Sequence, residues 1–205
     1  MSTNRTDFHE TWLTEMPQGI GSFPMYDYLE YNIKDRIKSG SAVIDLGNGL
    51  KKIAGQQVVF YWYEKDGIIL LGAELGVKPQ GLVVTSLAKN PKIQNAPYAT
   101  DLYDAILKDS NRSIKLISDI DLSAEAFKVW ARLLNMGHTI SIYNSESPGQ
   151  TLKTISNVKE LTSYFKDDDR DYRKYQYVLS ESGEMLAETR SYFNTRRMRE
   201  LAGTL

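Results

Sequence analysis

The stretch "GLVVTSLAKNPKIQNAPYATDLYDAILKD", residues Gly81–Asp109, passes from strand-type to helix-type patterning within a short distance. Gly81–Ala88 is rich in apolar and β-branched residues, and Pro91–Tyr98 contains the Pro and Asn residues that favour loops. Apolar residues then recur at helical spacing, at Leu102, Tyr103, Ile106 and Leu107. The sequence therefore predicts a strand, a loop and a helix that starts directly after the loop, an arrangement that can cradle a phosphate group.

Four short apolar runs precede this stretch and are separated by turn residues. The runs are "SAVIDL", "GLKKIA", "QQVVFYWYE" and "GIILLGAEL", with Gly47–Gly49 and Asp66–Gly67 between the members of the first and the last pair. Gly-Asn-Gly and Asp-Gly both favour tight hairpins. We therefore expect an antiparallel meander.

A helix is expected before the meander. Its predicted apolar face is spaced four residues apart, at Met25, Leu29, Ile33 and Ile37. Gly40 is a suitable C-terminal stop. We expect this helix to pack on the sheet.

Strands and helices alternate after Asp109. "RSIKLISD", "HTISIY" and "YRKYQYVLS" favour strands, the last of them half-buried, with one face made by Tyr175, Tyr177 and Leu179. Ser123 is a predicted N-cap for a helix whose core stripe is Ala126, Val129, Trp130 and Leu133. Asn157 and Glu160 have capping-box spacing at a short helix. The fold class expected is α+β, with a mixed, mostly antiparallel sheet flanked by helices.

Length and composition favour one domain with two extensions. A chain of 205 residues can fill one core. We expect an N-terminal arm over residues 1–24, the domain over residues 25–180 and a C-terminal helical tail over residues 181–205. The tail carries arginines with interleaved aromatics, but neighbouring glutamates offset much of that charge, so nucleic-acid binding is the weaker interpretation.

Charge and cysteine content narrow the functional classes. Twenty-five Lys and Arg against 26 Asp and Glu leave a net charge of -1, so no bulk field attracts nucleic acid or an anionic membrane. The chain has no Cys, and His9 and His138 are its only imidazoles, which excludes disulfides, thiolate nucleophiles and zinc-thiolate sites. Asp167–Asp171 lacks the Gly and distal Glu of a calcium loop, so no metal is predicted. No segment approaches the roughly 20 apolar residues of a membrane helix, and we expect a cytoplasmic protein without a membrane partner.

The order of elements, together with "QNAPYA" at Gln94–Ala99, resembles the GNAT (GCN5-related N-acetyltransferase) superfamily, in particular its divergent members encoded by bacteriophages. The family signature is Gln or Arg, two residues, Gly, one residue, then Gly or Ala, between the fourth strand and its helix. Gln94 and Ala99 match it and Pro97 does not. The resemblance implies acetyl-CoA as cofactor and a host-cytoplasmic location if the chain is phage-encoded. The phosphate contacts that it implies are Gln94, Asn95, Ala96, Tyr98, Ala99 and Thr100, without the N–H that Pro97 lacks.

Further site residues follow from the same resemblance. Val84, Thr85 and Ser86 are the expected strand contacts to the pantetheine arm. Trp130 stands where the family often has a tyrosine that protonates the departing thiolate, and indole cannot do so. Tyr143 is the candidate proton donor in its place, against the alternative of a strand-end hydroxyl in water. Glu74 is the candidate general base, against the alternative of a solvated carboxylate.

Two functions therefore remain open. The first is a GNAT-like acyltransferase that moves an acetyl group from acetyl-CoA to an unknown amine acceptor. The second is a non-catalytic module on the same scaffold that binds a protein, in a phage particle or on a host factor. An enzyme needs an open cleft between the strand ending near Leu87 and the strand beginning near Ile114, whereas a non-catalytic descendant is expected to fill it with Tyr98 or Phe127.

Overall fold

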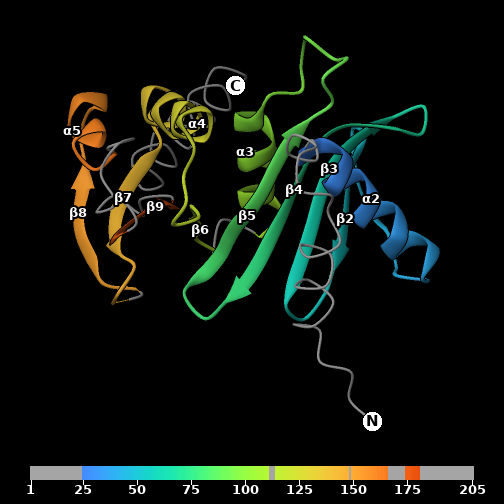
Figure 1. Ribbon diagram of the computed structural model, residues 1–205, viewed down its shortest axis with the longest axis horizontal. Coiled ribbons are helices and arrows are strands. Elements are labelled where there is room, and N and C mark those ends of the chain that lie inside the picture. Colours follow the sequence, from blue (N-terminus) through green and yellow to red (C-terminus); the bar gives the residue numbers. More distant parts are fainter. Residues whose placement is uncertain (1–24, 111–113, 148, 166–173, 181–205) are drawn as a thin grey trace, which may run out of the picture.

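The computed structural model describes residues 25–110, 114–147, 149–165 and 174–180 (Figure 1). Its elements, in chain order, are α2 (Met25–Lys38), β1 (Ile44–Gly47), β2 (Leu50–Ala54), β3 (Val58–Lys65), β4 (Ile68–Lys78), β5 (Gly81–Lys89), α3 (Ala99–Asp109), β6 (Leu116–Ile117), α4 (Ala124–Asn135), β7 (Thr139–Asn144), β8 (Thr151–Ile155), α5 (Val158–Thr162) and β9 (Tyr175–Ser180). The predicted N-terminal arm, C-terminal helix and Asp167–Asp171 lie outside the described residues.

One nine-stranded sheet runs through this part of the chain in the order β1-β2-β3-β4-β5-β6-β9-β7-β8. The β5–β6 pair is parallel and the other pairs are antiparallel. Helices flank the sheet, so the predicted α+β class with a mixed, mostly antiparallel sheet is confirmed (Figure 1).

The meander forms as predicted because its turns accept left-handed backbone. Gly47, Asn48 and Gly49 have φ angles of 87°, 53° and 76° in the β1–β2 turn. Asp66 and Gly67, at 52° and 76°, make the β3–β4 turn. These are conformations that Gly, Asn and Asp adopt more readily than other residues, and they match the twist of a hairpin.

Helix α2 packs on one face of the meander. Tyr26, Leu29 and Ile33 are buried in a cluster with Phe60, Trp62 and Ile69. The approach is close at Gly72, where an added Cβ would lie 2.3 Å from Leu29 Cδ2. The predicted helix is confirmed, but its face is rotated, because Met25 and Ile37 are 51% and 41% exposed.

Helices α3 and α4 contribute to the main hydrophobic core on the other face. Leu102, Tyr103, Ile106 and Leu107 of α3 are buried there, as predicted. Ser123 caps α4 by accepting a hydrogen bond from the Ala126 N–H at 3.2 Å. Of the predicted α4 stripe, Trp130 and Leu133 are buried, whereas Ala126 and Val129 are only half-buried.

Strand β9 differs from the half-buried strand predicted. It lies between β6 and β7, and Gln176, Tyr177, Val178 and Leu179 are all buried. The Gln176 side-chain amide is accommodated by donating to the Ser118 carbonyl oxygen at 2.9 Å. Tyr177 and Leu179 pack in the main core on one face, and Val178 packs with Val83, Ile117 and Tyr143 on the other, so alternation in the sequence did not translate into one exposed face.

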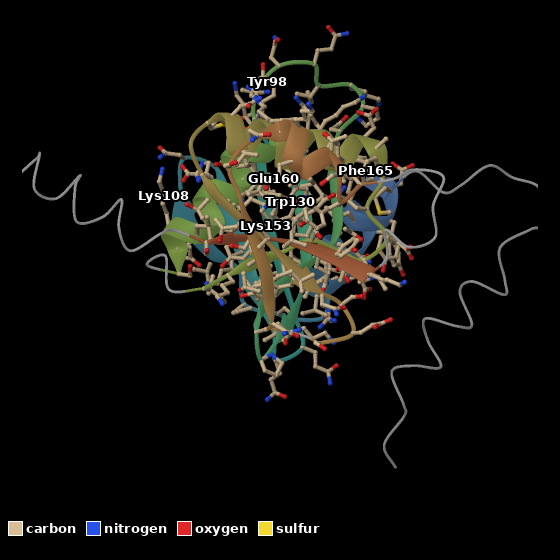
Figure 2. All side chains as sticks on the ribbon, turned by 90° about the vertical axis from the view of Figure 1, so that its left-hand side faces the viewer. Tyr98, Lys108, Trp130, Lys153, Glu160 and Phe165 are labelled. Carbon is tan, nitrogen blue, oxygen red and sulfur yellow. The ribbon has the colours of Figure 1, made fainter. Side chains whose placement is uncertain are left out.

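Strand β8 and helix α5 complete the sheet edge. β8 was not predicted; it is mostly exposed and pairs with β7. At α5 the Asn157 side chain accepts from the Glu160 N–H at 2.9 Å, as the capping box predicts, but the Glu160 carboxylate accepts from the Ser156 N–H instead of the cap residue. A hydrogen bond from Lys153, followed by those from Ser156, lowers the pKa of Glu160 to about 2 (Figure 2).

Candidate functional site

The parallel pair at the centre of the sheet is very short. Leu82 pairs with Leu116 and Val83 with Ile117, and the Leu82 N–H donates to the Lys115 carbonyl oxygen at 2.9 Å. Among the described residues, no strand pairs with this edge of β5 beyond Val83. The last part of β5 therefore has an edge that β6 does not cover, and Figure 1 shows the following loop projecting from the top of the molecule.

The direction of the backbone hydrogen bonds shows which N–H groups of β5 point to the edge that β6 does not cover. The Asn90 N–H donates to the Leu70 carbonyl oxygen of β4 at 2.9 Å. Since the hydrogen-bonding groups of successive strand residues point to alternate sides, those of Leu87 and Lys89 point away from β4. Two backbone N–H groups thus line the uncovered edge.

A β-bulge interrupts β5 where the predicted strand contacts lie. Glu74 pairs with Ser86 and Leu75 with Val84, so Thr85 has no partner in β4. The Thr85 hydroxyl donates to the Glu74 carbonyl oxygen at 3.0 Å and lies 3.5 Å from its carboxylate Oε1. Bulges bend a strand and re-aim its groups, and they are frequent beside active sites. Val84 and Ser86 are buried and Thr85 is exposed.

Ser86 and Glu74 are cross-strand neighbours next to this bulge. Ser86 is 9% exposed, and no hydrogen bond joins its hydroxyl to another described residue. Tyr28 of α2 lies near Glu74: burial raises the pKa of Tyr28, the Glu74 charge raises it further, and a hydrogen bond with Asn32 opposes both. The bulge, a carboxylate and a phenol thus gather on the α2 face of the sheet.

The loop that follows β5 is held by its own polar groups. Lys89 Nζ donates to the Gln94 carbonyl oxygen at 3.3 Å and to that of Asn95. The Ala96–Pro97 peptide bond is cis. The Tyr98 N–H donates to the Asp101 carboxylate at 2.8 Å, so one of the predicted phosphate donors is already engaged. Ala99 and Thr100 begin α3, and Thr100 is buried.

Two cations flank the ring of Tyr98, at the start of α3. Lys89 Nζ and Arg132 Cζ each lie 5.0 Å from the ring centroid. Tyr98 is 41% exposed, and Figure 2 places it at the outer edge of the molecule, apart from Trp130 in the interior. Neither cation was predicted: Lys89 ends β5 and Arg132 belongs to α4, and both reach the Tyr98 ring only in the folded chain.

The two residues expected to fill the cleft of a non-catalytic descendant, Tyr98 and Phe127, have different neighbours. Tyr98 lies with Lys89 and Arg132, as described. Phe127 stacks on Phe165 at a centroid distance of 4.5 Å and contacts Tyr177 of β9 at 6.1 Å. These contacts direct Phe127 toward α5 and β9.

Trp130 belongs to the core. Its ring centroid lies 5.8 Å from that of Tyr103 and 6.0 Å from that of Tyr177, and the side chain is almost fully buried. The indole therefore fills space between α3 and the sheet.

Tyr143 lies beside the paired end of β5 and β6. It is buried in a cluster with Val83, Ile117 and Val178. Its hydroxyl accepts a hydrogen bond from Lys115 Nζ at 2.5 Å. The Lys115 side chain thus donates a hydrogen bond to the Tyr143 phenol beside the paired end of β5 and β6.

Among the described residues there is no group of three or more His, Asp and Glu side chains that could hold a metal ion. No described helix is both long and apolar enough to cross a bilayer. Comparison with known proteins identified no relative: no family model, curated protein or solved structure matches this chain significantly.

Proposed function

We propose that this chain is a GNAT-like N-acyltransferase that moves an acetyl group from acetyl-CoA to an amine. The observation that carries the proposal is the construction of β5: a strand paired with a parallel neighbour only at its start, bulged at Thr85, and followed by a loop and the N-terminus of α3. An uncovered strand edge offers backbone N–H groups to an amide-rich chain such as pantetheine.

The residues around the edge fit the parts of the cofactor. The edge N–H groups of Leu87 and Lys89 would hydrogen-bond the pantetheine arm, with Val84, Thr85 and Ser86 beside the thioester. The N-terminus of α3 carries about half a unit of positive charge. The cations Lys89 and Arg132 stand beside it and would attract the phosphates, offsetting the donor lost at Pro97.

The chemistry requires positioning more than a nucleophile from the protein. The amine attacks the thioester carbonyl carbon, a C–N bond forms, the C–S bond breaks and the thiolate leaves. Glu74 beside the bulge would take the proton from the amine, and backbone N–H groups at the bulge would stabilise the developing oxyanion. Tyr143 is the sequence candidate for protonating the thiolate, with Lys115 as its proton source, but it is buried beside Val83 and Ile117, so this role would require the thioester to reach back to the end of the paired segment.

One contact favours the alternative, a non-catalytic module that binds a protein. The Asp101 carboxylate occupies the Tyr98 N–H at the start of α3 and brings a negative charge where a phosphate would bind. A protein partner would leave this contact in place, whereas a phosphate would have to displace it or bind beside it.

Calorimetric titration of acetyl-CoA separates the two functions. We expect saturable binding by the full chain, weakened about tenfold or more in Arg132→Glu, because reversing the charge removes one attraction and adds a repulsion. Lys128→Glu is the matched control, since it lies on the same helix, is exposed and pairs with Glu125. Absence of binding at millimolar acetyl-CoA, or an equal loss in both variants, would contradict the proposal.

A further inference from the structure

Asn90, the first residue after β5, has all its polar groups engaged. Its side-chain Nδ2 donates to the Tyr26 hydroxyl at 3.0 Å and to the Ile69 carbonyl oxygen at 3.3 Å. Its Oδ1 accepts from the Lys92 N–H at 3.0 Å, and its carbonyl oxygen accepts from the Ile93 N–H at 3.0 Å. The residue is 7% exposed. A buried polar side chain with every group paired has one favoured orientation, because any other leaves a group unsatisfied.

Tyr26 connects this residue to α2. Its side chain is buried, and its hydroxyl donates to the Ile69 carbonyl oxygen at 2.8 Å while accepting from Asn90. The Ile69 carbonyl oxygen therefore accepts hydrogen bonds from both the Tyr26 hydroxyl and Asn90 Nδ2. Three segments meet at this point: α2, β4 and the first residues of the loop.

The orientation of Asn90 sets the path of the loop. Its Oδ1 and carbonyl oxygen hold the next residues, Lys92 and Ile93, in a turn. Lys89 then ties the carbonyl oxygens of Gln94 and Asn95 back to the end of β5. The loop thus reaches Tyr98 from a fixed starting point, and the Tyr98 ring lies between the strand and α4.

We propose that Asn90, together with Tyr26, is a positioning residue. It joins the loop to α2 and holds the loop in the conformation that binds the phosphates of acetyl-CoA. This inference rests on the proposed acyltransferase function. The affinity for the phosphate-bearing part of the ligand would then depend on the buried contact between Asn90 and Tyr26, which does not touch the ligand. The same contact fixes the helix that carries Tyr28 near Glu74.

The first variant is Asn90→Asp, which keeps the shape and replaces the Nδ2 donor by a carboxylate oxygen. That oxygen faces the Ile69 carbonyl oxygen and the Tyr26 hydroxyl, whose proton is donated to the same carbonyl oxygen. Tyr26→Phe removes only the hydroxyl and is the second variant, in case the first does not fold. Ile33→Val is the control. Ile33 is buried in α2 in the same cluster as Tyr26, but its side chain forms no hydrogen bond to Asn90. It lowers stability through packing alone.

Binding of three probes is measured for each protein: acetyl-CoA, adenosine 3',5'-bisphosphate and S-acetylpantetheine, which lacks phosphate. We expect Asn90→Asp and Tyr26→Phe to weaken the two phosphate-bearing probes about tenfold and threefold, respectively, and to leave S-acetylpantetheine within twofold. Ile33→Val should leave all three within twofold. A purely structural role would weaken the three probes equally.

The outcomes distinguish this inference from the proposed function. If the wild-type chain binds acetyl-CoA and both Asn90→Asp and Tyr26→Phe bind it as tightly, the positioning role is wrong and the acyltransferase proposal stands. An equal loss for all three probes also overturns the positioning role. If the wild-type chain binds none of the probes, the proposed function fails and the positioning role fails with it.

Discussion

At its first residues β5 is paired on both edges, whereas from Val84 onward only the β4 edge is paired within the described residues. The paired end is tight: Gly81 has a φ of 149°, and an added Cβ would lie 2.4 Å from the Lys115 carbonyl oxygen. The other end contains the bulge at Thr85, the loop, and Ser86, whose hydroxyl has no hydrogen bond to a described residue. One strand thus combines an end paired on both edges with an end where, within the described residues, only the β4 edge is paired.

The largest effect is expected at the paired end. Leu116→Ala removes a side chain of 0% exposure from the core, and cavities of this kind cost about 2–5 kcal/mol of unfolding free energy. Urea denaturation followed by circular dichroism measures the loss. A loss below about 1 kcal/mol would mean that the parallel pair is not an anchor of the sheet.

A buried serine just beyond the paired end should matter next. The Ser118 hydroxyl accepts from the Tyr177 N–H at 2.9 Å and donates to the Asp119 carbonyl oxygen at 2.9 Å. Ser118→Ala leaves a buried N–H unsatisfied, at a cost of about 1–3 kcal/mol. The same denaturation measurement applies, and a neutral result would show that β9 shifts to satisfy the N–H elsewhere.

Asp109, the last residue of α3, should make the stability of the fold depend on pH. It accepts hydrogen bonds from Lys52 Nζ and the Tyr61 hydroxyl, both at 2.7 Å. Burial alone would raise the pKa of Asp109, but the hydrogen bonds from Lys52 and Tyr61 outweigh it, so the pKa is lowered. A pKa below the unfolded value of about 4 stabilises the fold above that pH, and the stabilisation is lost as the pH falls through the folded-state pKa.

The experiment for Asp109 compares wild type with Asp109→Asn across about pH 2.5 to 7. We expect the difference in unfolding free energy between them to be constant above about pH 5 and to shrink below about pH 4. A difference that does not change with pH would contradict a role for the Asp109 charge.

The smallest effect is expected at the uncovered end. Ser86→Ala removes a buried hydroxyl that has no hydrogen bond to a described residue, so the free energy of unfolding should change by less than about 1 kcal/mol. Compared with Ser118→Ala, this substitution contrasts two buried serines in neighbouring segments. Equal losses for both would mean that the hydrogen bonds of the Ser118 hydroxyl contribute no stability beyond that of a buried serine without such bonds.

Local patterns were sufficient for much of the fold. Gly-Asn-Gly and Asp-Gly fixed the hairpins, Ser123 marked the start of α4, and the spacing of Leu102 to Leu107 identified the buried face of α3. Each of these signals lies within a few residues of the structure that it determines.

Long-range features could not be predicted from local sequence patterns. The placement of β9 between β6 and β7 depends on pairing between distant segments, and β8 pairs with the outer edge of β7. The bulge at Thr85 reflects a register between β4 and β5 that alternation does not specify. Val84–Ser86, Gln94–Ala96 and Tyr98–Thr100 were predicted as contacts from a family resemblance. Lys89 and Arg132 were not, because they meet at the Tyr98 ring only in the folded chain.

The central claim is that the uncovered end of β5 binds acetyl-CoA, and an NMR titration of backbone amides tests it most directly. We predict shift changes concentrated between Thr85 and Thr100, including the N–H groups of Leu87 and Lys89, and none at Leu82 or Leu116. No change at millimolar acetyl-CoA, or changes confined to the paired end, would contradict the account.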